Sequence, residues 1–138
     1  MQMDAQIWIT GRVGTEVEYR MVKDIPFAQF RLGCTPSYNR NGQWNELDTT
    51  WLSVSCSRRL AEGVQESVKK GDPVVVTGRL RTDRWIDSQG VEHERLKLEA
   101  TSVGHDLAWG TAVFNKRNNP DGAIMEAAAE DDRDVRAA

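Results

Sequence analysis

A tryptophan lies on the polar face of one predicted strand. In residues 49–57 apolar and polar residue types alternate with period two, which is typical of a strand with one buried face. Leu52 and Val54 are on the apolar side, so Trp51 stands opposite them, among serines and threonines. Such a ring can stack on an unpaired nucleobase, but it can equally cover a sheet edge or contact another protein.

The next predicted strand carries the same combination with more charge. In residues 73–85 the valines face the core, which puts Trp85 on the outer face with Arg79 and Arg81. Aromatic rings stack on bases of any identity, and nearby cations meet the phosphates, so we predict sequence-tolerant binding of single-stranded nucleic acid. The remaining candidate phosphate contacts are Arg31, Arg84, Arg95 and Lys97.

Four further aromatic residues receive different interpretations. Tyr38 and Trp44 lie in the polar segment 36–48, which has the composition of a long hairpin, and aromatic residues in such loops often contact ligands. We therefore add both to the candidate DNA-binding residues. Trp8 is as suited to a subunit interface as to DNA, and Trp109 is expected to pack at the end of the domain.

Five strands and one helix must position these side chains. The helix is predicted over 58–70, where Leu60, Ala61, Val64 and Val68 form one amphipathic stripe. A parallel α/β sheet would need a helix after nearly every strand, whereas one helix between the third and fourth strands indicates an all-β OB-fold, a five-stranded Greek-key barrel. The strands are predicted over 6–13 (the pattern resuming through 17–22), 27–35, 49–57, 73–85 and 91–103, with a short sixth over 111–115.

Length and charge indicate one folded domain with a tail. The chain has 138 residues, of which 39% are hydrophobic. We expect an OB-fold DNA-binding domain over 1–117 and a disordered acidic tail over 118–138, which contains six Asp or Glu residues and two Arg residues. Neither a secretory signal pattern nor an apolar run of roughly 18 residues is present, so a cytoplasmic, nucleoid-associated location without membrane contact is expected.

Motifs for catalysis are missing from the sequence. It has no glycine-rich phosphate loop, no nucleophile elbow and no zinc-type spacing of Cys34, Cys56, His93 and His105. We therefore expect no enzyme, no cofactor and no metal, and interpret both cysteines as buried free thiols, with a disulfide left open. The main alternative is an OB-fold protein-interaction module of a replication-restart or similar complex, in which the tryptophans bind a protein partner.

Several short motifs follow one another along most of residues 5–110. They are Gly11-Arg-Val, Glu18-Tyr19-Arg20, Thr49-x-Trp51, Ala61-Glu62-x-Val64, Lys70-Gly71-x-x-Val74-x-Val76-x-Gly78-Arg-Leu80-Arg81-Thr82-x-x-Trp85, and Gly90. In this order and spacing they resemble the bacterial single-stranded DNA-binding protein (SSB) family. That resemblance implies an OB-fold homotetramer around which single-stranded DNA wraps in replication, recombination or repair, with no cofactor and no catalytic residue. Trp51 and Trp85 match the family's two stacking tryptophans of the sheet, and Tyr38 lies near a third aromatic position.

Two departures from the family pattern stand out. Ser57 occupies a position where the family often has an aromatic residue, which implies one stacking contact fewer. The chain ends in Arg136-Ala137-Ala138 instead of the acidic tip with Pro-Phe that recruits repair enzymes. The resemblance is therefore to an accessory paralogue with weak or no such recruitment. Residues 107–117 resemble the extension that, in some actinobacterial-type relatives, clamps neighbouring subunits.

Overall fold

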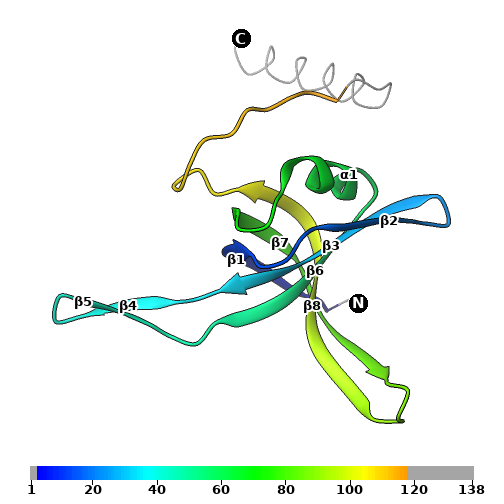
Figure 1. Ribbon diagram of the computed structural model, residues 1–138, viewed down its shortest axis with the longest axis horizontal. Helices are drawn as coiled ribbons and strands as arrows, with labels where there is room; N and C mark the ends of the chain where they lie inside the picture. The colour runs from blue at the N-terminus through cyan, green and yellow to red at the C-terminus, as the bar shows by residue number, and fades with distance from the viewer. Residues whose placement is uncertain (1–2, 118–138) are drawn as a thin grey trace.

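Five strands curve into a closed barrel in the computed structural model, which describes residues 3–117 (Figure 1). The sheet order is β1-β7-β8-β6-β3-β2, and pairing of Arg12 with Gly33 and of Val13 with Leu32 joins β1 to β3 and closes the ring. This is the predicted all-β OB-fold. The barrel strands are β1 (Ala5–Val13), β3 (Ile25–Cys34), β6 (Thr50–Ser57), β7 (Pro73–Ile86) and β8 (Glu92–His105).

An additional strand, β2 (Glu18–Val22), pairs along the outer edge of β3. The chain reverses at Lys23 and Asp24, whose φ angles are 50° and 65°, both in the left-handed region that tight hairpin turns require. Treating 17–22 as a continuation of the first strand was therefore wrong. The sequence does not indicate this turn, because Lys-Asp lacks the Asn-Gly signature of such hairpins.

The segment predicted as a long hairpin forms a separate two-stranded ribbon that projects from the barrel (Figure 1). Its strands are β4 (Ser37–Arg40) and β5 (Gln43–Glu46). Asn41 and Gly42 connect them with φ angles of 54° and 80°, a pair of values that Asn-Gly adopts readily. The hairpin prediction is confirmed, and both strands lie within the predicted range 36–48.

One helix, α1 (Arg58–Ser67), covers one end of the barrel and contacts β3, β6 and β8 (Figure 1). The predicted stripe is confirmed, since Ala61, Val64 and Val68 are buried. The helix ends three residues earlier than predicted because Val68 takes an extended conformation. Gly71 does not end the helix; its N–H donates to the carbonyl of Val13 at 2.7 Å and ties the loop to the barrel.

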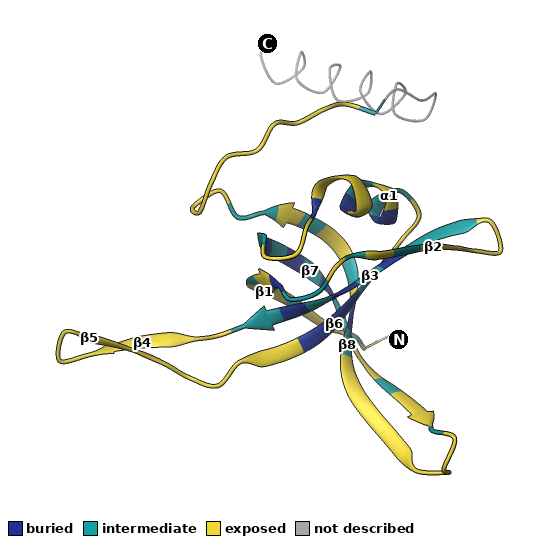
Figure 2. Cartoon of the chain, in the orientation of Figure 1, coloured by how far each residue is buried: buried dark blue, intermediate teal, exposed yellow. Residues whose placement is uncertain are grey.

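The core lies where the inner faces of the strands meet α1 (Figure 2). Alternate residues of β3, β6 and β7 are buried, including Val54, Val74 and Val76, as period two demands, whereas β1 and β8 bury one residue each, Val13 and Leu98. Cys56 is buried among them, and this burial raises the pKa of its thiol to about 12. Cys34 is half-buried, and both cysteines are free thiols.

Residues 106–117 leave the barrel through a turn over 106–109 and then continue as an extended segment (Figure 1). The predicted strand over 111–115 was wrong, because no strand among the described residues pairs with this stretch. Leu107, Val113 and Phe114 are exposed, while Arg117 donates hydrogen bonds to the Glu62 carboxylate at 2.8 Å and to a backbone carbonyl of α1. The predicted acidic tail, 118–138, lies outside the described residues. Within 3–117, no helix has the length and apolarity of a membrane span.

Candidate nucleic-acid interface

Four neighbouring strands present one continuous outer face. Cross-strand partners share a face, and the register joins Arg31 of β3 to Ser53 of β6, Ser53 to Lys97 of β8, and Lys97 to Arg81 of β7. The same alternation puts Trp51 and Trp85 on this side, together with Arg79 and Arg95. We call it the odd face, because its members carry odd residue numbers. Seven of the ten predicted site residues lie on it: Arg31, Trp51, Arg79, Arg81, Trp85, Arg95 and Lys97.

Trp51 lies against two glycines, and its ring is 49% exposed. A Cβ atom built on Gly14 would be 2.5 Å from the ring atom Cζ3, and one built on Gly33 would be 3.0 Å from it. Any larger residue at either position would therefore push the ring away. The glycines let the indole lie close to the backbone while leaving exposed area on which a base can stack.

Two cations beside Trp51 are available for phosphates. The guanidinium carbon of Arg31 lies 5.9 Å from the centroid of the indole, within the range of a cation–π contact. Lys97 follows in the same cross-strand row, on the far side of Ser53. Within residues 3–117, neither Arg31 nor Lys97 has a carboxylate at ion-pair distance. A phosphate can therefore bind them without displacing an acidic side chain.

Trp85 lies on a projecting arm formed by the ends of β7 and β8 (Figure 1). The ring of His93 stacks on it, with centroids 5.4 Å apart and planes 20° apart. The guanidinium carbon of Arg95 lies 5.1 Å from the indole centroid, and its Nε is 3.5 Å from Asp83. These neighbours fix the orientation of Trp85, which is still 41% exposed.

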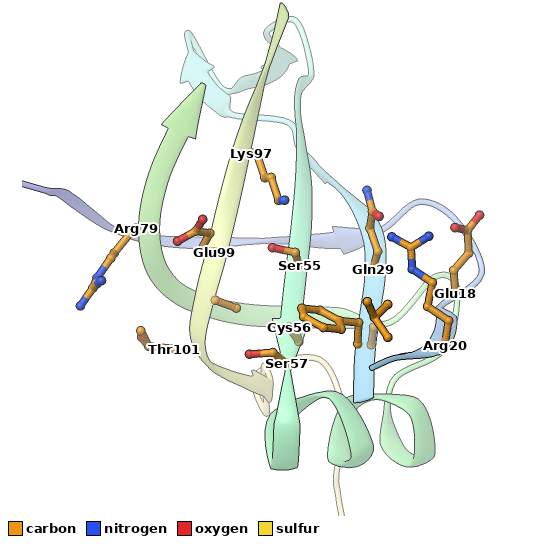
Figure 3. Close-up of a pocket in the computed structure, with 14 residues that line it drawn as sticks. Glu18, Arg20, Gln29, Ser55, Cys56, Ser57, Arg79, Lys97, Glu99 and Thr101 are labelled. Carbon is orange, nitrogen blue, oxygen red and sulfur yellow. The ribbon is translucent and has the colours of Figure 1, made fainter. Parts of the chain in front are cut away.

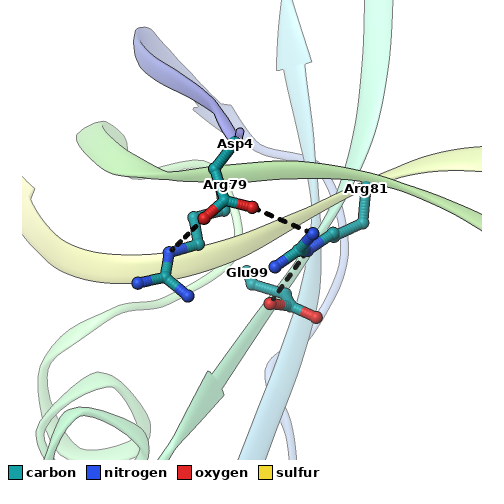
Figure 4. Close-up of polar contacts among 4 residues, drawn as sticks. All are labelled: Asp4, Arg79, Arg81 and Glu99. Atoms are coloured by element: carbon teal, nitrogen blue, oxygen red, sulfur yellow. Dashed lines mark hydrogen bonds and ion pairs between the residues drawn. The ribbon is translucent and has the colours of Figure 1, made fainter. Parts of the chain in front are cut away.

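Arg79 and Arg81 are held in a network of acidic residues (Figure 4). Asp4 lies 3.1 Å from Nη1 of Arg81 and 3.8 Å from Nε of Arg79, and Glu99 lies 3.5 Å from Nε of Arg81. Both guanidinium groups are more than two-fifths exposed, so these ion pairs are weak. A phosphate that binds here must compete with Asp4.

The odd face continues past Ser55 into a hollow of about 620 Å³ (Figure 3). Its walls carry both signs of charge, with Arg79 and Lys97 opposed by Glu18 and Glu99. Ser57, at the end of β6, also lines the hollow. Its side chain is small and occupies little of the space that an aromatic residue at this position would take up.

Three predicted site residues do not lie on the odd face. Arg84 points to the opposite side of the arm and pairs with Glu94 at 3.2 Å. Tyr38 and Trp44 lie on the separate ribbon, where Trp44 is paired with Asn39. Because neighbouring residues on a strand point to opposite faces, Tyr38 and Trp44 are on opposite sides of the ribbon. Only one of them can face the same side as Trp51.

Sequence reasoning missed the residues that support the tryptophans. Gly14 and Gly33 lie under Trp51, His93 stacks on Trp85, and Asp4 holds two arginines. The position of His93 could have been predicted in part, because it lies eight residues after Trp85, near the start of the next predicted strand. No signal pointed to Asp4, because its contact depends on the register between β1 and β7.

The described part of the chain contains no cluster of three or more His, Cys, Asp or Glu side chains that could hold a metal ion. A closed barrel with stacking-competent tryptophans and unpaired cations on one sheet face defines the class of OB-fold proteins that bind single-stranded nucleic acid. Residues 4–106 match the Single-strand binding protein family. The chain belongs to that family.

The relatives agree with this assignment. The chain is 39% identical over 114 residues to Single-stranded DNA-binding protein 2 of Tropheryma whipplei (strain Twist), covering 80% of this chain and 74% of the relative. It is 35% identical over 118 residues to Single-stranded DNA-binding protein 2 of Streptomyces avermitilis, covering 84% and 74%. The crystal structure of the small single-stranded DNA-binding protein from Streptomyces coelicolor is similar to it, with a TM-score of 0.72 and 32% identity, over 79% of this chain and 100% of that one.

Proposed function

We propose that this protein binds and protects single-stranded DNA without sequence preference, as an accessory member of its family. The observation that carries the proposal is the half-exposed Trp51 ring, laid on Gly14 and Gly33, with the Arg31 guanidinium beside it. Lys97 lies further along the same cross-strand row, and within residues 3–117 neither cation has a carboxylate at ion-pair distance. Stacking on an indole tolerates any base, and the cations bind the backbone. Trp85, with Arg95 beside it, supplies a second stacking position on the arm. Binding needs no chemical step, and the site of action is wherever single strands form on the nucleoid.

The test is a titration of the full chain with oligo(dT), followed by tryptophan fluorescence at low and high salt. We expect strong quenching and an affinity that falls as salt rises, since phosphate contacts release counterions. Trp51→Ala and Trp85→Ala should each weaken binding about 5- to 150-fold, the range that one base–aromatic stack contributes. Salt-independent absence of quenching would support the protein-interaction module and contradict the proposal.

We further propose that the protein assembles as a homotetramer. The extended segment 106–117 supports this, because Leu107, Val113 and Phe114 are exposed in the single chain. A row of apolar side chains on an extended segment is more stable against a neighbouring subunit than in water. Light scattering of the purified protein should give four times the chain mass, and a monomer at micromolar concentration would contradict the assembly.

A further inference from the structure

Trp109 does not pack at the end of the domain, as its sequence position suggested. Its side chain is 69% exposed. The backbone around it is nevertheless fixed, because the N–H of Trp109 donates to the carbonyl of Asp106 at 3.2 Å and the N–H of Asp106 donates to the carbonyl of Pro73 at 3.0 Å. The Asp106 carboxylate accepts the N–H of Ala108 at 3.1 Å. An exposed indole is thus presented from a turn that is tied to β7.

A guanidinium group lies over the indole of Trp109. The guanidinium carbon of Arg12 is 5.3 Å from the ring centroid, a cation–π distance. Arg12 is itself positioned, since its Nη1 donates to the carbonyl of Gly71 at 3.3 Å. With Arg12 on one side and a large exposed area remaining, the ring has the same arrangement as Trp51 beside Arg31 and Trp85 beside Arg95.

Trp109 and Trp51 line the same cleft. It has a volume of about 680 Å³, within the roughly 300–1,000 Å³ of ligand pockets, and Arg12 and Gly33 contribute to its wall. Glu46 and Asp106 also line it, so the interior offers hydrogen-bond acceptors to a base edge and disfavours a phosphate. The cleft is continuous with the Trp51 platform.

We propose that Trp109 is a third stacking position, which takes the nucleobase next to the one on Trp51, with Arg12 as its positioning residue. This inference rests on the proposed function, because it extends the path of the same DNA strand. A single-stranded DNA that leaves Trp51 through the cleft passes between β1 and the β4–β5 ribbon, toward the turn at Asp106.

The experiment compares Trp109→Ala with Ile86→Ala in oligo(dT) titrations of the full chain. Ile86 is a control matched in exposure, because it is 70% exposed, lies on the side of the arm opposite Trp85 and does not line the cleft. We expect Trp109→Ala to weaken binding about 5- to 150-fold, Trp109→Phe to retain most of the affinity, and Ile86→Ala to stay within about twofold. Light scattering should show the same oligomeric state for all three variants as for the unmodified chain.

A second measurement uses the unmodified protein. Oligo(dT) carrying 5-iododeoxyuridine is photocrosslinked, and mass spectrometry should find the adduct on Trp109 as well as on Trp51. Unchanged affinity of Trp109→Ala overturns the inference, as does a loss of affinity that comes with a changed oligomeric state, which would assign Trp109 to a subunit contact. If Trp51→Ala weakens binding while Trp109→Ala does not, only this inference fails; if the unmodified chain does not bind oligo(dT), the proposed function fails first.

Discussion

Replacing Gly14 by alanine should weaken DNA binding without weakening the fold. The new Cβ would lie 2.5 Å from Cζ3 of Trp51, whereas ordinary contact begins at 3.4 Å, so the ring must move by about 0.9 Å. It has room to do so, because Trp51 is half-exposed and can swing toward solvent. The backbone at Gly14 has no positive φ that would strain an alanine.

The magnitude follows from these contacts. Displacing a stacking ring by about 1 Å removes part of the 1–3 kcal/mol that a stacked base contributes, so we expect a loss of about 1 kcal/mol, or fivefold in Kd. Gly33→Ala, whose Cβ would meet the ring at 3.0 Å, should cost less. Gly104→Ala is the control, because its Cβ would meet nothing within 4 Å.

The assay is an oligo(dT) titration of the three variants by fluorescence anisotropy, with the melting temperature of each measured in parallel. The order of affinity loss should be Gly14→Ala, then Gly33→Ala, then Gly104→Ala, with Tm values within a few degrees of the parent chain. Equal affinities for Gly14→Ala and Gly104→Ala at unchanged Tm would refute the reasoning, because they would show that DNA does not depend on where the Trp51 ring lies.

Three further variants test the arginine network, the core and the arm. Asp4→Asn should tighten oligo(dT) binding about two- to threefold at low salt and steepen its salt dependence, because Arg81 loses a competing carboxylate 3.1 Å away; unchanged binding would mean that Asp4 does not compete. Leu98→Ala should cost about 2–5 kcal/mol in urea unfolding because Leu98 is fully buried, and the exposed neighbour Leu96 provides the control, with a loss below about 1 kcal/mol for Leu96→Ala. The pKa of Asp87 is lowered from its usual 3.8, chiefly by the hydrogen bond with His93 and then by the hydrogen bond from the N–H of Val91. The ionised carboxylate therefore stabilises the folded state above pH 3.8. This stabilisation is lost as the pH falls from 3.8 through the lowered pKa. Asp87→Asn should therefore lower the urea midpoint at pH 7, and this difference should shrink as the pH falls below 3.8; a difference that does not change with pH would count against this assignment.

Much of the barrel was predictable because the apolar residues of β3, β6 and β7 follow period two in the core. The exceptions are Ser53, which is buried between Leu52 and Val54, and the register shift between Thr77 and Gly78. Spacing alone predicts the buried positions of Val54, Val74, Val76 and Leu98, and the same spacing places Trp51 on the outer face. The inclusion of Arg84 among the phosphate contacts is not supported by this spacing, because its even number places it on the side of the arm opposite Trp85.

Contacts that depend on register or on side-chain length could not be predicted. The Asp4–Arg81 pair joins residues 77 positions apart, and nothing in their local sequence indicates which arginine the carboxylate reaches. The prediction that Trp109 packs at the end of the domain was wrong, because the turn that begins at Asp106 leaves the side chain 69% exposed. Turn geometry of this kind is set by backbone hydrogen bonds that residue types alone do not specify.

Trp51 and Trp85 lie on parts of the sheet that differ in rigidity. Trp51 pairs with Gly33 of β3, and Gly33 itself pairs with Arg12 of β1 where the barrel closes, while β6 pairs with β8 only over Ser53–Ser55. Trp85 is near the tip of the arm, where β7 beyond Leu80 pairs only with β8, and a two-stranded ribbon on its own is barely stable in water. In the proposed interface, a bound strand would therefore have one fixed contact, at Trp51, and one flexible contact, at Trp85, which could break and reform while the first persists. Partial release of this kind would expose part of the DNA before the whole strand dissociates.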